Sequence, residues 1–161
     1  MTTTIRIGRV SDAPGIAQLT AQLGYELTAS DAAARLSRIL ARQDQQFIVA
    51  DIDARVVGWA HAVVVDYVDA EPFVRIGGLV VDRNHRRMGI GRALLARAET
   101  WAVEQGCSFV RLSSTATRTA AHRFYEDVGY TNIKTQFSFI KSVDGSGAER
   151  FRAFVPRLDS E

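Results

Sequence analysis

One stretch limits the folds open to this chain more than any other: an apolar, β-rich run that passes through a basic loop with two glycines into a strongly periodic helix. The run is FVRIGGLVVD at 73–82, the loop is RRMGIG at 86–91, and the helix is predicted over 91–105. A strand that turns directly into a helix is a building unit of sheets with helices packed on their faces. We therefore expect an α/β fold.

The rest of the chain continues this alternation of strand-like and helix-like segments. Short β-rich runs predict strands, and apolar residues spaced three and four apart predict helices. The predicted order is β-α-α-β-β-β-α-β-α-β-β, an α/β (α+β mixed sheet) fold. The segments are 4–10, 11–23, 30–42, two runs within 46–66 joined at 51–55, then 73–82, 91–105, 109–115, 118–129, and two short strands within 130–141.

Composition narrows the class of protein. The 161 residues, 47% of them apolar, suffice for one buried core, which we expect over residues 1–141. The 20 Lys and Arg against 18 Asp and Glu leave a net charge of +2, too small to indicate a nucleic-acid partner. Cys107 is the single cysteine, no signal-peptide pattern opens the chain, and no apolar stretch has membrane-span length. A cytoplasmic protein without membrane or nucleic-acid partners is expected.

The loop at 86–91 has the outline of an anion site. A helix N-terminus offers unpaired N–H groups and a positive dipole end, and glycine lets an anion approach the backbone. The nucleotide fingerprints do not fit, because Leu94 stands where a dinucleotide loop has its third glycine and Arg92 follows Gly91 where a Walker loop has lysine. The alternative, for the loop taken alone, is an ordinary turn.

The surrounding residues carry a resemblance to a known family. GGLVVDRNHRRMGIGRALLARAETWA at 77–102 resembles the acetyl-coenzyme A binding core of the GNAT acyltransferase superfamily, and RRMGIG fits its Gln/Arg-x-x-Gly-x-Gly/Ala loop. AAHRFYEDVGY at 120–130 is similar to the family's A-x-x-F/L-Y-E-x-x-G-F/Y segment. The resemblance implies a GNAT-type N-acetyltransferase with a mostly antiparallel sheet, splayed at a bulge and covered by helices on both faces.

The resemblance also implies where acetyl-coenzyme A (acetyl-CoA) binds. The strand backbone at 79–81 would pair with the pantetheine arm beside a bulge or kink at 77–78, where glycines weaken an ordinary strand. Arg86 would close the loop, and loop N–H groups would hold the pyrophosphate. The implied cofactor-binding residues are Leu79, Val80, Val81, Arg86, Arg87, Met88, Gly89, Ile90, Gly91 and Arg92.

The implied chemistry is direct acetyl transfer from the thioester to an amine, without a metal. The backbone N–H near Leu79 would stabilise the developing oxyanion. Tyr125 would protonate the departing thiolate; the alternative is that it packs beside Phe124. Arg75 stands where many relatives carry a general-base glutamate, and an arginine cannot accept a proton. The family's usual base is therefore missing, and the candidate substitutes, acting directly or through water, are the acids Asp66, Asp69, Glu71 and Glu26.

Other polar residues bear on the acceptor. Glu26, Asp69 and Glu71 are candidate substrate-binding acids, which hint at a cationic amine such as an aminoglycoside, a polyamine, or a protein lysine or N-terminus. Arg118 replaces an asparagine of many relatives, so contacts to the cofactor arm there are not assumed. His61 is a lone histidine for which a structural role is expected.

Two functions other than acetyl transfer also fit parts of the sequence. A non-catalytic acyl-CoA sensor would keep RRMGIG without needing Tyr125. A nucleic-acid binder would use the arginines on phosphates, but this sequence has no aromatic residues interleaved with them.

The composition changes at residues 142–161, which begin with a Gly/Ser joint. The apolar side chains of Phe151 and Phe154 there need a surface to pack on, either in their own domain or in a second subunit. A homodimer is one expected outcome.

Overall fold

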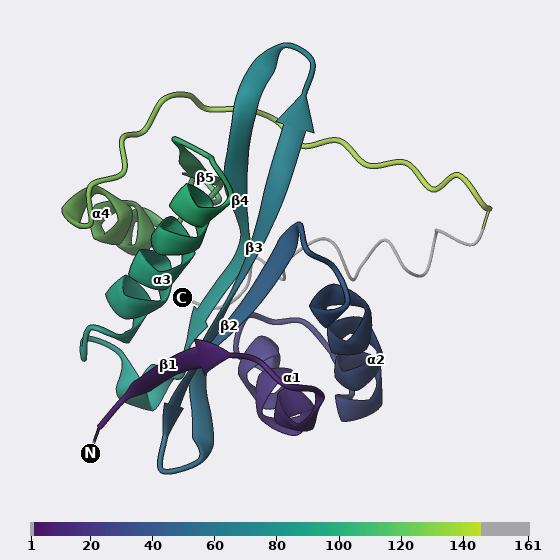
Figure 1. Cartoon of the computed structure of the whole chain (residues 1–161), viewed down its shortest axis with the longest axis vertical. Coiled ribbons are helices and arrows are strands. Elements are labelled where there is room, and N and C mark those ends of the chain that lie inside the picture. The colour runs from purple at the N-terminus through teal and green to yellow at the C-terminus, as the bar shows by residue number, and fades with distance from the viewer. Residues whose placement is uncertain (1, 146–161) are drawn as a thin grey trace. The chain divides into compact units, whose positions relative to one another are not determined.

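A computed structural model describes residues 2–145 and divides the chain into two compact units, Met1–Leu112 and Ser113–Glu161. The first unit holds the five-stranded sheet and the first three α-helices (Figure 1), and the second holds the fourth helix. The elements are β1 Thr4–Ile7, α1 Ala13–Ala21, α2 Ala29–Leu40, β2 Gln45–Ile52, β3 Arg55–Tyr67, β4 Ala70–Val81, α3 Ile90–Glu104, β5 Val110–Leu112 and α4 Thr119–Asp127, with short 3-10 turns η1 Val10–Asp12 and η2 Arg83–His85. Up to α4 this is the predicted order.

The sheet has its strands in chain order, β1-β2-β3-β4-β5. The pairs from β1 to β4 are antiparallel and connected by short segments or by the two helices α1 and α2, whereas β4 and β5 are parallel and need the crossover helix α3. The predicted mixed, mostly antiparallel sheet is therefore confirmed.

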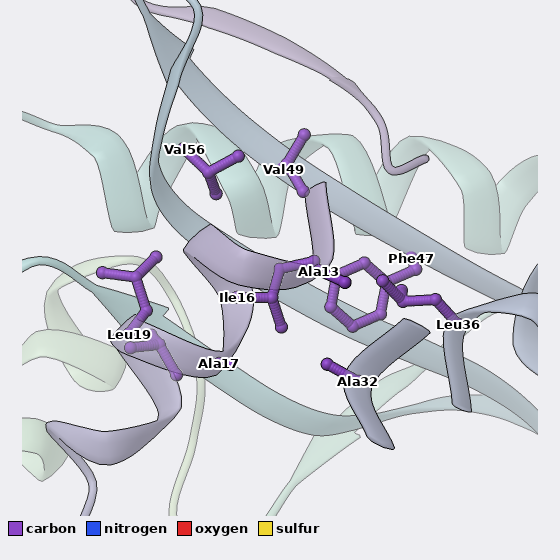
Figure 2. Packing of buried hydrophobic residues seen from close by; sticks show 10 residues of the cluster. Ala13, Ile16, Ala17, Leu19, Ala32, Leu36, Phe47, Val49 and Val56 are labelled. Carbon is purple, nitrogen blue, oxygen red and sulfur yellow. The ribbon is translucent and has the colours of Figure 1, made fainter. Parts of the chain in front are cut away.

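One face of the sheet is covered by α1 and α2. Their apolar residues enclose Phe47 and Val49 of β2, and Val56 and Val80 join the same buried cluster. In Figure 2 the side chains of Ala13 and Leu36 approach Phe47 from the two helices. Burial of this apolar surface is what holds the short helix α1 in place, because an isolated helix of its length is not stable in water.

The opposite face is covered by α3, as Figure 1 shows. A Cβ added to Gly58 of β3 would lie 3.2 Å from side-chain carbons of Ile90 and Leu94, so the first turns of α3 lie directly on this strand. Ile90 and Leu94 are fully buried. This packing fixes the N-terminus of α3, and with it the end of the loop at 86–91.

The two strands predicted within 130–141 are wrong. The structure has no regular secondary structure there, and Ile133, Phe137 and Phe139 are exposed, the last two by 89% and 93%. Alternating apolar residues are typical of a strand, but a strand forms only where another strand pairs with it. In the part of the chain that the structure describes, this segment pairs with none. Phe151 and Phe154 lie outside the described residues.

The close approach at Gly58 gives the first prediction. Gly58→Ala places a Cβ 2.9 Å from the carbonyl oxygen of Val80 and against Ile90 and Leu94, so backbone and helix must move apart. We expect a loss of about 1–3 kcal/mol in the free energy of unfolding, measured by urea denaturation. Gly77→Ala is the matched control, because its Cβ meets nothing closer than 3.8 Å. Equal stability of the two variants would contradict this packing.

Candidate active site

A one-residue bulge interrupts β4. Across β3, His61 is opposite Gly78 while the next residue, Ala62, is opposite Ile76, so Gly77 has no partner. Glycine is needed sterically at Gly78, where a Cβ would come within 2.6 Å of the Trp59 ring. The bulge that the two glycines favour is therefore confirmed.

The bulge changes which edge of β4 each residue faces. Before it, the N–H of Val74 donates to the carbonyl of Phe109 on the β5 side, at 3.0 Å. After it, the N–H of Asp82 donates to Val57 of β3, at 2.8 Å. Because hydrogen-bonding direction alternates along a strand, Leu79 and Val81 direct their N–H and C=O groups away from β3.

That edge of β4 is open beyond the bulge. Pairing between β4 and β5 ends at Ile76, opposite Leu112, although β4 continues to Val81. Of the strands in the described sheet, none pairs with Leu79 or Val81 on this side. An extended chain of amide groups can therefore add to β4 here as another strand would.

The loop at 86–91 leads from this edge into α3. Arg87 and Gly89 adopt positive φ values of 63° and 78°, and Gly89 is the N-cap of α3. Left-handed residues in such a turn direct successive N–H groups into one concavity, which suits an anion. A Cβ added to Gly89 would meet no atom within 4 Å, so the space over this cap is open.

The first turn of α3 adds more donors. The first bond of the helix runs from the N–H of Ala93 to the carbonyl of Gly89, at 3.0 Å. The preceding N–H groups, at residues 90–92, consequently have no partner within the helix, and they sit at the positive end of its dipole. Arg86, Arg87 and Arg92 are exposed around this turn and add positive charge. The loop has the donors and the charge for a phosphate.

Arg86 joins the loop to the strand end. Its Nε donates to the carbonyl oxygen of Val81 at 3.3 Å, which agrees with an outward-facing Val81. The resemblance implies that Arg86 closes the loop, and this hydrogen bond would hold the loop against the end of β4.

A buried carboxylate fixes the start of the same loop. Asp82 accepts hydrogen bonds from the N–H of Asn84 and from Gln22 of the α1 C-terminus, and lies 3.1 Å from Nδ1 of His85. Gln22 in turn accepts from the N–H of Arg83 at 3.0 Å. Burial disfavours the charged carboxylate, but these donors outweigh it and hold the pKa of Asp82 below its ordinary value.

A polar hollow of about 330 Å³ lies behind this anchor. Its walls come from α1, the start of β3, and the segment from the end of β4 into η2, with Gln22, Arg55 and Asp82 among them. None of these walls is the open edge of β4. The hollow is therefore separate from the place where an extended chain could add to the sheet.

The predicted acceptor acids are spread over different segments. Glu26 is exposed between α1 and α2, Asp69 is exposed at the turn between β3 and β4, and Glu71 is exposed at the start of β4. Glu71 precedes Leu79 by eight residues of β4, which corresponds to roughly 25 Å at about 3.3 Å per residue. Asp69 and Glu71 thus belong to one hairpin, and Glu26 belongs to the segment between α1 and α2.

Arg75, in the place of the family glutamate, is also exposed. Its Nη2 lies 3.4 Å from the hydroxyl of Tyr67, and its guanidinium is 5.8 Å from the ring centre of Phe73. An arginine side chain has no hydrogen-bond acceptor, so Arg75 cannot take the role of a general base.

Tyr125 belongs to the second unit, on α4. Its ring lies 5.3 Å from that of Phe124 and 6.2 Å from that of Tyr130. Burial raises the pKa of Tyr125, and the positive charge of Arg118, the N-cap of α4, only partly opposes this. The phenol consequently keeps its proton at neutral pH, as a proton donor must.

His61, for which a structural role is expected from the sequence, lies beside the bulge, opposite Gly78. Its partner Gly78 could be identified only from the register of β3 against β4, which one sequence does not reveal.

Cys107 is buried, as expected of a small apolar residue, and burial raises the pKa of its thiol. In the described part of the chain no helix is long and apolar enough to cross a membrane, and no group of three or more His, Cys, Asp or Glu could hold a metal ion.

Comparisons with known proteins agree with this geometry. The sequence pattern of the Acetyltransferase (GNAT) family matches residues 16–130. The aminoglycoside N(6')-acetyltransferase type 1 of Stenotrophomonas maltophilia is 30% identical over 132 residues, 79% of this chain and 85% of that protein. A putative acetyltransferase from Agrobacterium tumefaciens str. C58 is 28% identical with a TM-score of 0.77, covering 86% of this chain and 99% of that one. The chain belongs to the GNAT acetyltransferase family.

A solved structure with lower identity shares the fold. Aminoglycoside N-acetyltransferase AAC(6')-Iy, in complex with CoA, has a TM-score of 0.79 at 22% identity, covering 87% of this chain and 95% of that one. For four other curated relatives, the match with this chain spans only 13% to 44% of the relative's own length. The predicted family, the mixed α/β fold and the acyltransferase class to which the family belongs are confirmed.

The anchor at Asp82 gives the second prediction. Because the folded pKa of Asp82 is lowered, its carboxylate contributes stability that is fully present above the unfolded pKa of about 3.9 and is lost as the pH falls through the folded value. Asp82→Asn should therefore reduce the free energy of unfolding at pH 7 by about 1–3 kcal/mol, and the difference should shrink toward pH 3.5. Urea denaturation across this range measures it. A difference that stays constant with pH would show that the charge is irrelevant.

Proposed function

We propose that this protein is an N-acetyltransferase that moves the acetyl group of acetyl-CoA directly to a primary amine. The observation that carries the proposal is the open edge of β4, where the bulge turns the N–H groups of Leu79 and Val81 outward next to the anion-binding loop. A long cofactor with an amide-containing arm and a pyrophosphate matches this sequence of features. Solved relatives support it, since AAC(6')-Iy is described in complex with CoA.

The residues present fit the cofactor. The backbone of 79–81 would pair with the pantetheine arm, and the N–H groups of the loop and first helical turn would bind the pyrophosphate. These groups belong to Arg87, Met88, Gly89, Ile90, Gly91 and Arg92. The side chain of Arg86 would keep the loop against the strand end. When bound, acetyl-CoA supplies an acetyl group activated as a thioester.

The chain would contribute two groups to the transfer itself. The N–H of Leu79 would donate to the carbonyl oxygen as negative charge develops on it, and one such donor is typically worth about 3 kcal/mol. Tyr125 would donate its proton to the departing sulfur. The raised pKa of Tyr125 supports this role, because the phenol is protonated when it is needed. The resemblance of 120–130 to the family segment supports it independently.

The acceptor is proposed to be a small cationic amine. Glu26, Asp69 and Glu71 are exposed acids that could attract it, and the relative from Stenotrophomonas is named for an aminoglycoside. We further propose a cytoplasmic protein with a single domain over 1–141. Residues 142–161 would contact a second subunit of a homodimer.

The first test of this function changes Gly89 in the proposed pyrophosphate-binding loop at 86–91. Gly89→Val would project a side chain into the open space over the α3 N-terminus and should weaken acetyl-CoA binding by roughly 100-fold or more, because charged hydrogen bonds are typically worth about 1.5–3 kcal/mol each. Gly24→Val is the matched control: Gly24 also has a positive φ, 85°, and open space around it, but lies between α1 and α2. If calorimetry finds that Gly89→Val binds acetyl-CoA with wild-type affinity, the loop does not bind the pyrophosphate.

The second test removes the proposed proton donor. Tyr125→Phe deletes one hydroxyl, so turnover should fall by about 10²- to 10⁴-fold while the dissociation constant of acetyl-CoA changes little. Tyr130→Phe removes the hydroxyl of the neighbouring ring and should keep turnover. Thiol release in an amine screen measures both. If wild type binds acetyl-CoA tightly and acetylates no amine, the protein is instead an acyl-CoA sensor, the reading that Arg75 in the glutamate position favours.

A further inference from the structure

His61 occupies the face of β3 that looks onto the bulge. It is the register partner of Gly78, and a Cβ built on Gly77 would lie 3.8 Å from its Nδ1. Gly77 has no side chain, so nothing of that residue stands between the imidazole and the backbone of the bulge. Leu79, the proposed oxyanion donor, follows two residues later. The ring is half-buried and thus remains open to a ligand.

The contacts of His61 fix the orientation of its ring. Nε2 lies 2.8 Å from Oε1 of Gln45 on β2. An amide oxygen only accepts hydrogen bonds, so Nε2 is the donor and carries the proton. Phe47 lies 5.8 Å from the imidazole, and Trp59 stacks on Phe47 at 5.3 Å. In the neutral ring Nδ1 then has a free lone pair, and this lone pair is on the side of Gly77.

The surroundings keep this imidazole neutral. Burial lowers the pKa of His61 below its ordinary value of about 6.5, and no charged group contributes to the shift. Its side-chain contacts on β2 include Gln45 and Phe47, and the glycines of the bulge, Gly77 and Gly78, lie next to it on β4. Arg75, farther along β4, turns its guanidinium to Tyr67 and Phe73 instead. A neutral acceptor nitrogen at pH 7 is the state that a general base requires.

We propose that His61 is the general base of the acetyl transfer, taking a proton from the ammonium group of the acceptor through Nδ1. The inference rests on the proposed function and supplies the base that Arg75 cannot provide. Glu71 lies on β4, like Arg75, but is roughly 25 Å from Leu79 along that strand at about 3.3 Å per residue. His61, by contrast, lies opposite Gly78, next to the bulge.

The proton and electron balance of the step is complete. Nδ1 accepts one proton from the ammonium group, which leaves imidazolium and a neutral amine. The nitrogen lone pair then forms the C–N bond while the C–S bond breaks and its electron pair leaves on sulfur. The nitrogen then loses a second proton to water, and water returns one proton to Tyr125, which has given its own to the sulfur. The imidazolium returns its proton to water, so the overall reaction releases one proton. Nothing is oxidised or reduced.

The test is the pH dependence of kcat/KM between pH 5 and 9. Wild type should show an acidic limb below about pH 6.5, where the imidazole becomes protonated. His61→Gln should lower kcat/KM at pH 7 by about 10²- to 10⁴-fold and abolish this limb, with little change in acetyl-CoA affinity by calorimetry. His122→Gln is the control: it removes another imidazole, bound to the carbonyl of Thr115, and should keep the wild-type profile.

A second variant retains the base and changes only its partner. Gln45→Glu places a carboxylate 2.8 Å from Nε2 and should raise the pKa of His61, so the acidic limb moves to higher pH. In the double variant Gln45→Glu with His61→Gln the limb should be absent. A purely structural histidine predicts neither result.

The outcomes separate this inference from the proposed function. If wild type acetylates an amine while folded His61→Gln keeps its rate and acidic limb, His61 is not the base but the enzyme stands. An unmoved limb in Gln45→Glu would overturn the assignment as well. A wild-type protein that binds acetyl-CoA and acetylates no amine overturns both the enzyme and its base.

Discussion

The arrangement of the site depends on one unpaired residue, Gly77. Without it, the alternation of hydrogen-bonding direction along β4 would run unbroken from Val74 onward. The N–H and C=O groups of Leu79 and Val81 would then point to β3. With it, both residues face the edge from which β5 has already parted. A bulge costs ladder hydrogen bonds, and its use in re-aiming groups near functional sites is a recurrent one. Here it turns the middle of a sheet into a short free edge.

The core places the second half of the site relative to that edge. Ile90 and Leu94 pack on Gly58 of β3, so the N-terminus of α3 is fixed against the same part of the sheet that carries the bulge. Asp82 and Gln22 hold the connecting turn from the other side. The free strand edge and the free helix N–H groups are thus two ends of one rigid connection, and a single extended ligand could use both. The proposed acetyl-CoA site follows from this.

Much of this could be predicted from the sequence, because the signals are local. Apolar spacing predicted the elements up to α4, the paired glycines indicated a bulge or kink, and the loop motif together with the segment at 120–130 indicated the family. The failures concern long-range pairing. Phe137 and Phe139 alternate as in a strand, yet alternation does not supply a partner. His61 was passed over because its relation to Gly77 depends on strand register, which becomes visible only when β3 and β4 are aligned.

The central claim is that the bulge exposes the N–H groups of Leu79 and Val81 for cofactor binding, and amide hydrogen exchange tests it most directly. Gly78 and Val80 direct their N–H groups to β3 and serve as internal references, protected with or without ligand. We predict that Leu79 and Val81 exchange rapidly in the free protein and become strongly protected when acetyl-CoA is added, while the references change little. Tight acetyl-CoA binding that leaves the exchange of Leu79 and Val81 unchanged would contradict the account.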